Sequence, residues 1–145
     1  APYAPTFVTV DAIVVQSGHV LLVRRRAAPG KGLWAMPGGF LDPNERIRDA
    51  VIRELREETG IKVPEPVLRG SIIDQGYVFD DPNRSTRGRT ITHAFLINLP
   101  PDVVLPKVKG SDDAEKAKWV PLSEVHMHMM FEDHYHIIEH LTARI

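Results

Sequence analysis

Three glutamates crowd the end of one predicted helix. Glu54, Glu57 and Glu58 stand at positions i, i+3 and i+4, so they share one helix face. Like charges at this spacing repel by roughly a few tenths of a kcal/mol per pair. The negative end of the helix dipole adds to that cost. A divalent cation would reverse the sign of the arrangement, and oxygen donors favour Mg²⁺ or Mn²⁺ over Zn²⁺. The alternative is a solvated face on which Arg53 and Arg56 neutralise the acids.

The residues around these glutamates follow a fixed pattern. It consists of Gly39, five residues, Glu45, seven residues, Arg53-Glu54-Leu55, one residue, Glu57-Glu58, one residue, and Gly60-Ile61. This pattern resembles the Nudix box, so the chain is similar to the Nudix hydrolases. The resemblance implies the Nudix fold and hydrolysis of a nucleoside diphosphate linked to another group.

The resemblance also implies roles for the residues of the box. Glu54, Glu57 and Glu58 are the expected metal ligands and catalytic residues, and the Gly38 carbonyl is a further ligand. Bound Mg²⁺ or Mn²⁺ would neutralise phosphate charge and lower the pKa of a bound water. Substrate oxygens would complete the coordination shell.

Two further features concern the frame of the box. Arg53 and Glu45 are expected to pair and to brace the preceding loop against the helix. Arg46 stands where Nudix sequences often carry a capping Ser or Thr, so we expect Asn44 to cap the helix instead. Gly60 suits the left-handed position just past the helix end.

Other stretches bear on the substrate. They are FVTVDAIVV (7–15), PNRSTRGRTITHAFLI (82–97), SDDAEKAKWVPLSEV (111–125) and FEDHYHIIEHL (131–141). They resemble ADP-ribose pyrophosphatases, above all the Nudix domain that follows a nicotinamide mononucleotide adenylyltransferase in bifunctional bacterial enzymes. This resemblance implies Mg²⁺-dependent cleavage of ADP-ribose to AMP and ribose 5-phosphate. The alternatives are an enzyme that removes oxidised nucleoside triphosphates and a non-catalytic module that senses ADP-ribose.

Arginines supply candidate contacts to the substrate phosphates, because a guanidinium matches a phosphate in geometry and charge. Strand alternation puts Arg24 and Arg26 on one face and Arg25 on the other. A solvated polar loop is the alternative for the arginines between residues 80 and 89. The expected substrate-binding residues are Arg24, Arg26, Arg84, Arg87 and Arg89.

An acid in the loop GSDDAEKAKW (110–119) is expected to act as the general base or an extra metal ligand. By resemblance this is Glu115, with Asp112 and Asp113 as competitors in the same acidic loop. Trp34, Tyr77 and Phe79 are candidates to stack on adenine, and burial in the core is the alternative for Trp34. His136 and His140 stand at i, i+4, but no acid-assisted zinc motif accompanies them.

Hydrophobic periodicity predicts the elements that position these residues. We expect strands over 7–15, 19–25, 67–75, 90–99 and 117–120, and a short extended piece over 33–36. Helices are expected over 46–59 and 131–143. Gly38 and Gly39 are expected to interrupt regular structure. The mixture predicts an α/β/α sandwich with a mixed sheet.

Composition bounds the class of protein. The 145 residues carry a formal net charge of −1, which gives no indication of a nucleic-acid or membrane-surface partner. There is no cysteine, so disulfides and thiolate sites are excluded, and a cytoplasmic location fits. We expect a linker or trimmed end over 1–6 and a Nudix domain over 7–145. Fusion to an N-terminal adenylyltransferase domain and a homodimer are arrangements that the sequence leaves open.

Overall fold

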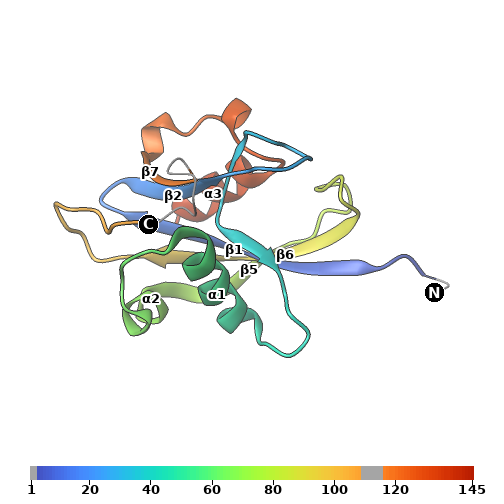
Figure 1. Ribbon diagram of the computed structural model, residues 1–145, viewed down its shortest axis with the longest axis horizontal. Helices are drawn as coiled ribbons and strands as arrows, with labels where there is room; N and C mark the ends of the chain where they lie inside the picture. The colour runs from blue at the N-terminus through green and yellow to red at the C-terminus, as the bar shows by residue number, and fades with distance from the viewer. Residues whose placement is uncertain (1–2, 109–115) are drawn as a thin grey trace.

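Among the residues that the structure describes, seven strands and three α-helices make up the fold (Figure 1). The computed structural model describes residues 3–108 and 116–145. The strands are β1 (Thr6–Gln16), β2 (His19–Arg24), β3 (Trp34–Ala35), β4 (Gly38–Phe40), β5 (Ile72–Phe79), β6 (Arg89–Asn98) and β7 (Ala117–Pro121). The helices are α1 (Ile47–Thr59), α2 (Glu65–Gly70) and α3 (His134–Thr142), with short 3₁₀ turns at Leu122–Glu124 and Met127–Met129.

One mixed sheet organises the molecule. Its main order is β3-β2-β1-β6-β5, with β4 paired to β1 and β7 paired to β2. The central pair, β1 and β6, is parallel over ten residue pairs from Thr6↔Arg89 to Val15↔Asn98. The other pairings are antiparallel. The expected mixed sheet is therefore confirmed.

Alternation along the central strands sends apolar side chains to both faces of the sheet. From β1, Val10, Ala12 and Val14 pack in a cluster with α1 and α2, whereas Ile13 and Val15 pack in a second cluster with α3. Figure 1 shows α1 and α2 together on one side and the C-terminal segment on the other. Helices thus cover both faces, which confirms the α/β/α sandwich.

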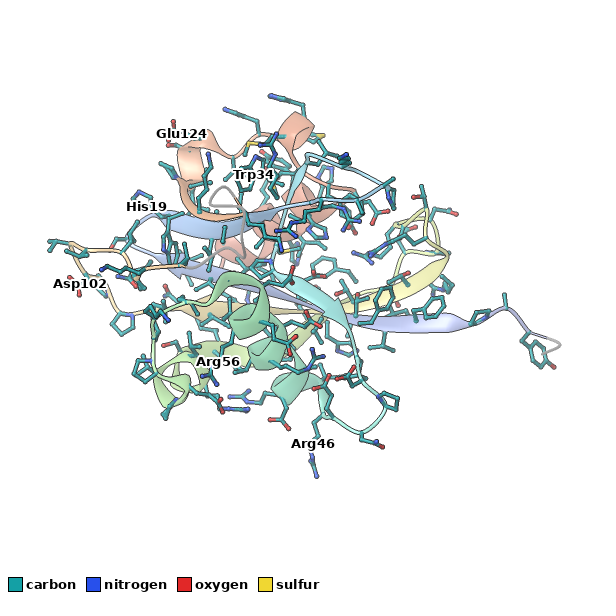
Figure 2. All side chains as sticks on the ribbon, in the orientation of Figure 1. His19, Trp34, Arg46, Arg56, Asp102 and Glu124 are labelled. Atoms are coloured by element: carbon teal, nitrogen blue, oxygen red, sulfur yellow. The ribbon has the colours of Figure 1, made fainter. Side chains whose placement is uncertain are left out.

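Helix α1 matches its predicted extent, apart from its first residue. It ends where Gly60 adopts φ 55° and donates its N–H to the Arg56 carbonyl at 2.9 Å, as expected. The capping prediction was wrong, because the N-cap is Arg46 and no side chain makes a cap hydrogen bond. Figure 2 shows the Arg46 side chain pointing away from the fold.

Two segments differ from the sequence prediction. Gly38 and Gly39 belong to β4, because they pair with Asp11 and Val10 of β1. The segment predicted as a strand over 67–75 begins instead with α2. Proline in the first turn of α2 and Glu65 at its start favour a helix there, and Leu68 anchors it in the core.

Smaller differences lie at the C-terminal end. Strand β7 includes Pro121, and α3 begins at His134 because residues 131–133 form the turn that leads into it. No helix within residues 3–108 and 116–145 is both long and apolar enough to cross a bilayer.

Candidate active site

Strand β4 brings two glycines against the glutamate end of α1. The Gly38 N–H donates to Glu58 Oε1 at 2.7 Å. A Cβ at Gly39 would lie 2.6 Å from Glu54 Oε1, and one at Gly38 would overlap the Val10 carbonyl and lie 2.5 Å from Asp11 Oδ1. Only glycine fits this close approach of backbone to carboxylate.

Partial burial raises the pKa of two of the box glutamates. Desolvation raises the pKa of Glu58 to about 7, against the opposing effect of its hydrogen bond from Gly38. Desolvation also raises the pKa of Glu54, while Arg53 acts in the opposite direction. Ionised Glu54 raises the pKa of Glu58 further. A cation at this site would relieve the cost of ionising both carboxylates.

Arg53 contacts three of the acidic side chains of the box. It pairs with Glu45 through contacts of 2.6 and 2.9 Å, which confirms the predicted pair. One of its nitrogens, Nη1, also contacts Glu54 at 2.9 Å and Glu57 at 3.3 Å. Glu57 is the most open of the three helix acids, with 61% of its side chain exposed. Arg53 therefore links the loop before α1 to the acidic face of the helix.

The donor set suits a hard divalent cation. The side chains of Glu54, Glu57 and Glu58 offer only carboxylate oxygens, the ligand type that Mg²⁺ and Mn²⁺ take. The partly buried Glu54 and Glu58 ionise against a desolvation cost that such a cation offsets. Within residues 3–108 and 116–145, no three His, Asp or Glu side chains already form a metal shell. The site thus fits a cation whose shell substrate and water help to complete.

A cleft of about 290 Å³ opens beside Glu58. Three of the five arginines predicted to bind substrate line it, namely Arg24, Arg26 and Arg87. The cations at its wall outnumber the acids, which are Asp11 and Glu58. The full lining comprises Thr9, Asp11, Val23, Arg24, Arg25, Arg26, Ala27, Ala35, Met36, Gly38, Gly39, Glu58, Arg87, Lys116, Phe131 and His134. The cleft therefore favours an anionic ligand next to the box.

Two predicted arginines do not line this cleft. The side chain of Arg84 is only 3% exposed, and its Nε and Nη2 each lie 2.9 Å from a carboxylate oxygen of Asp133. Arg89 donates to the Asp80 carbonyl at 2.6 Å. Arg84 thus has a structural partner within the fold. Glu115 and its competitors Asp112 and Asp113 lie outside the described residues.

Sequence reasoning missed several residues of the cleft. Arg25 was assigned to the opposite strand face, but β2 ends at Arg24, so alternation no longer applies to it. Burial lowers the pKa of Arg25, and the neighbouring Arg87 lowers it further. Phe131 reaches the cleft from the turn before α3, and its place directly after Met129 and Met130 in the sequence gave no signal for this role.

A buried polar group underlies the cleft. His134 Nδ1 accepts the Met36 N–H at 3.0 Å, and burial lowers the pKa of this histidine. Asp11 Oδ2 accepts the Thr92 hydroxyl at 2.5 Å. Both residues line the cleft beside Gly38. The first bond joins α3 to the segment between β3 and β4, and the second joins β6 to β1.

The aromatic candidates for adenine stacking lie in separate places. Trp34 packs in the α3-side cluster, with Lys118 Nζ 4.9 Å from its ring centroid. Tyr77 and Phe79 form a group with His140, at centroid distances of 4.9 to 5.8 Å. Neither group lines the cleft beside Glu58. Stacking on adenine stays a prediction for these residues.

Comparisons with known proteins agree with this arrangement. A family model of the NUDIX domain matches residues 5–141. A curated ADP-ribose pyrophosphatase of Methanocaldococcus jannaschii is 34% identical over 85% of this chain and 66% of its own length.

Solved structures place the fold in the same group. A bifunctional NMN adenylyltransferase/ADP ribose pyrophosphatase from Francisella tularensis, complexed with AMP and a Mn ion, superposes with a TM-score of 0.91 at 46% identity. It covers 99% of this chain, which spans only 43% of that one. The NUDIX domain of Shewanella oneidensis NrtR, complexed with ADP ribose, gives a TM-score of 0.79 at 28% identity over 99% of this chain and 90% of that one.

The family match extends over nearly the whole chain, and it includes the glycine strand, the box helix and the cleft between them. The chain therefore belongs to the Nudix hydrolase family.

Proposed function

We propose that this domain hydrolyses the pyrophosphate of ADP-ribose to AMP and ribose 5-phosphate with the help of Mg²⁺. One observation carries the proposal: a cationic cleft is lined by the partly buried Glu58 and by Gly38 and Gly39 of β4. The similarity to an ADP-ribose pyrophosphatase, and to Nudix domains complexed with AMP or ADP ribose, supports the choice of substrate.

The chain's own groups have distinct tasks in this proposal. Glu54, Glu57, Glu58 and the Gly38 carbonyl would hold the divalent cation, which when bound supplies charge neutralisation and a more acidic water. Arg24, Arg26 and Arg87 bind the phosphates and orient the bond to be cut. Water attacks one phosphorus and the bridging oxygen leaves with the other phosphate. Glu115 is the proposed base for that water.

The test is hydrolysis by purified protein with ADP-ribose and Mg²⁺, read as release of AMP and ribose 5-phosphate. The double variant Glu57→Gln, Glu58→Gln keeps side-chain volume but removes two anionic ligands, so we expect kcat to fall by at least about a thousandfold. Arg56→Ala is the matched control, because Arg56 is exposed and pairs with Glu65. Turnover that survives the double substitution would refute the proposed mechanism.

A panel of substrates separates the alternatives. If kcat/KM is higher for an oxidised nucleoside triphosphate than for ADP-ribose, the triphosphate is the substrate and the proposal of ADP-ribose is wrong. Tight binding of ADP-ribose without turnover, with Mg²⁺ or Mn²⁺ present, would make the domain a sensor.

The assembly is a further part of the proposal. The Francisella protein joins an adenylyltransferase to a domain like this one, which supports the same fusion here. A homodimer is the second arrangement that we carry forward, and sedimentation velocity of the domain tests it.

A further inference from the structure

Four consecutive residues before and at the start of α3 contact segments around the cleft, and two of them, Phe131 and His134, line it. Phe131 donates its N–H to the Trp34 carbonyl at 2.8 Å and lines the cleft with its ring. Glu132 and Asp133 contact the loop between β5 and β6, and His134 binds Met36. This turn therefore organises loops that are far apart in the sequence.

The Phe131 ring is a platform for two arginines. The Arg25 guanidinium carbon lies 3.9 Å from the ring centroid, and that of Arg87 lies at 5.4 Å. A Cβ at Gly30 would lie 2.5 Å from the ring, so a glycine is needed for the β2–β3 loop to approach it. Arg25 Nε also donates to the Pro29 carbonyl at 2.8 Å. Two cations from different loops thus meet on one buried ring.

Glu132 holds this arrangement at a conformational cost. Its φ of 45° is unusual for a residue other than glycine, and such backbone costs on the order of 1–3 kcal/mol. Its Oε2 accepts the Thr86 N–H at 3.0 Å, and its Oε1 lies 3.6 Å from Arg87 Nη2. That Oε1 is buried and, among the described residues, has no hydrogen-bond partner. The strain is maintained because the carboxylate anchors the loop that carries Arg87.

Among the described residues, the arginines around Phe131 outnumber the carboxylates that pair with them. Arg84, in the same loop, is already paired with Asp133. Arg25 and Arg87 share the nearby Glu132, and Arg87 makes ionisation of Arg25 less favourable. Both arginines line the cleft. An anion between them would relieve their mutual repulsion and take up the guanidinium donors that face it.

We propose that Arg25, Arg87 and the Phe131 platform form a phosphate-binding subsite, and that Glu132 is the positioning residue that holds Arg87 in it. The ligand group is one phosphate of the pyrophosphate, which rests on the function proposed above. The other phosphate then lies toward Glu58, Gly38 and Gly39, which line the same cleft.

The test measures equilibrium binding of ADP-ribose, and separately of inorganic pyrophosphate, to protein kept metal-free with EDTA. Arg25→Ala and Arg87→Ala should each weaken binding by about tenfold or more, as expected for loss of a charged hydrogen bond. Arg56→Ala removes a cation elsewhere and should change binding by less than about twofold.

The variant Glu132→Gly distinguishes the role of Glu132 in holding Arg87 from its contribution to the stability of the fold. Glycine accepts a φ of 45° without strain, so the melting temperature should stay equal or rise. We expect binding to weaken by about tenfold, with KM raised more than kcat is lowered. Glu132→Gln keeps an acceptor for Thr86 and should retain part of the affinity.

The outcomes distinguish this inference from the proposed function. Weakened pyrophosphate binding in the three variants supports the subsite even if ADP-ribose proves not to be hydrolysed. Unchanged binding of both ligands in Arg87→Ala and Glu132→Gly overturns it, as does a wild-type protein that binds neither ligand. A lower melting temperature with unchanged KM would show that Glu132 serves only the fold.

Discussion

At the scale of single residues, Glu58 is the most informative group. Its partly buried carboxylate lies between a glycine strand and the cationic cleft, and desolvation raises its pKa to about 7. Ionising a partly buried acid of this kind costs free energy when no cation is bound. This cost is expected at a metal site, because the ligand carboxylates must be ionised to bind a cation and the cation then offsets the cost.

The raised pKa of Glu58 predicts a pH dependence of stability in EDTA. The folded state binds the proton more tightly than the unfolded chain, in which the pKa is near the ordinary 4.5. Stability therefore falls as the pH rises from about 4.5 through about 7, by up to ~3 kcal/mol from this group. Glu58→Gln removes that loss, so the variant should be more stable than wild type at pH 8. At pH 5 the difference in stability between the two proteins should be smaller.

Urea denaturation at the two pH values measures this difference. The comparison with Glu58→Gln isolates Glu58 from other groups that titrate in the same range, such as Glu54. A gap between variant and wild type that is equal at pH 5 and pH 8 would contradict the assignment. Mg²⁺ should narrow the gap at pH 8, because it binds the ionised carboxylate.

At the scale of elements, the site depends on the contact between β4 and α1. The antiparallel pairing of β4 with β1 sets Gly39 directly over the Glu54 carboxylate. No side chain fits between the two without displacing one of them. The short strand therefore fixes where the helix acids stand relative to the cleft.

Gly39→Ala should uncouple this contact. The added methyl would meet Glu54 Oε1 at 2.6 Å, and the carboxylate has to move. A misplaced ligand should lower kcat for the proposed hydrolysis by on the order of a hundredfold. Steady-state kinetics with ADP-ribose and Mg²⁺ measures it.

Gly70→Ala is the control for this substitution. Apart from its chain neighbours and its own helix backbone, no described atom lies within 4 Å of a Cβ at Gly70, which ends α2 away from the cleft. Activity should be unchanged there, and stability should rise slightly because alanine favours the helix. An equal loss of activity in both variants would argue against a specific role for Gly39.

At the scale of the whole molecule, distant segments are tied together behind the cleft. The bidentate pair between Arg84 and Asp133 joins the β5–β6 loop to the start of α3, across 49 residues of sequence. Neither partner has more than 25% of its side chain exposed. The pair holds in place the loop that carries Arg87.

Breaking this pair should cost stability. Asp133→Ala leaves the buried Arg84 charge without its carboxylate, so we expect a loss of about 3 kcal/mol in the free energy of unfolding. The double variant Arg84→Ala, Asp133→Ala should lose less than the sum of the single variants. Urea denaturation of the four proteins tests this, and a loss below about 1 kcal/mol in both single variants would contradict it.

The sequence by itself determined the parts that depend on local pattern. Helix α1, its Gly60 end, the Arg53–Glu45 pair and the two faces of the central strands follow from spacing along a few turns or pleats. The box residues stand at fixed positions on one helix, so their proximity needed no knowledge of the rest of the chain.

Only the tertiary structure decided the rest, because strand pairing and burial depend on partners far along the chain. Gly38 and Gly39 form a strand only because β1 is beside them. Arg84 is removed from the cleft by Asp133, and Arg25 is brought into it by Phe131. A residue's charge can be read from sequence, but the group that neutralises it is chosen by the fold, and that choice decides which arginines remain to meet a phosphate.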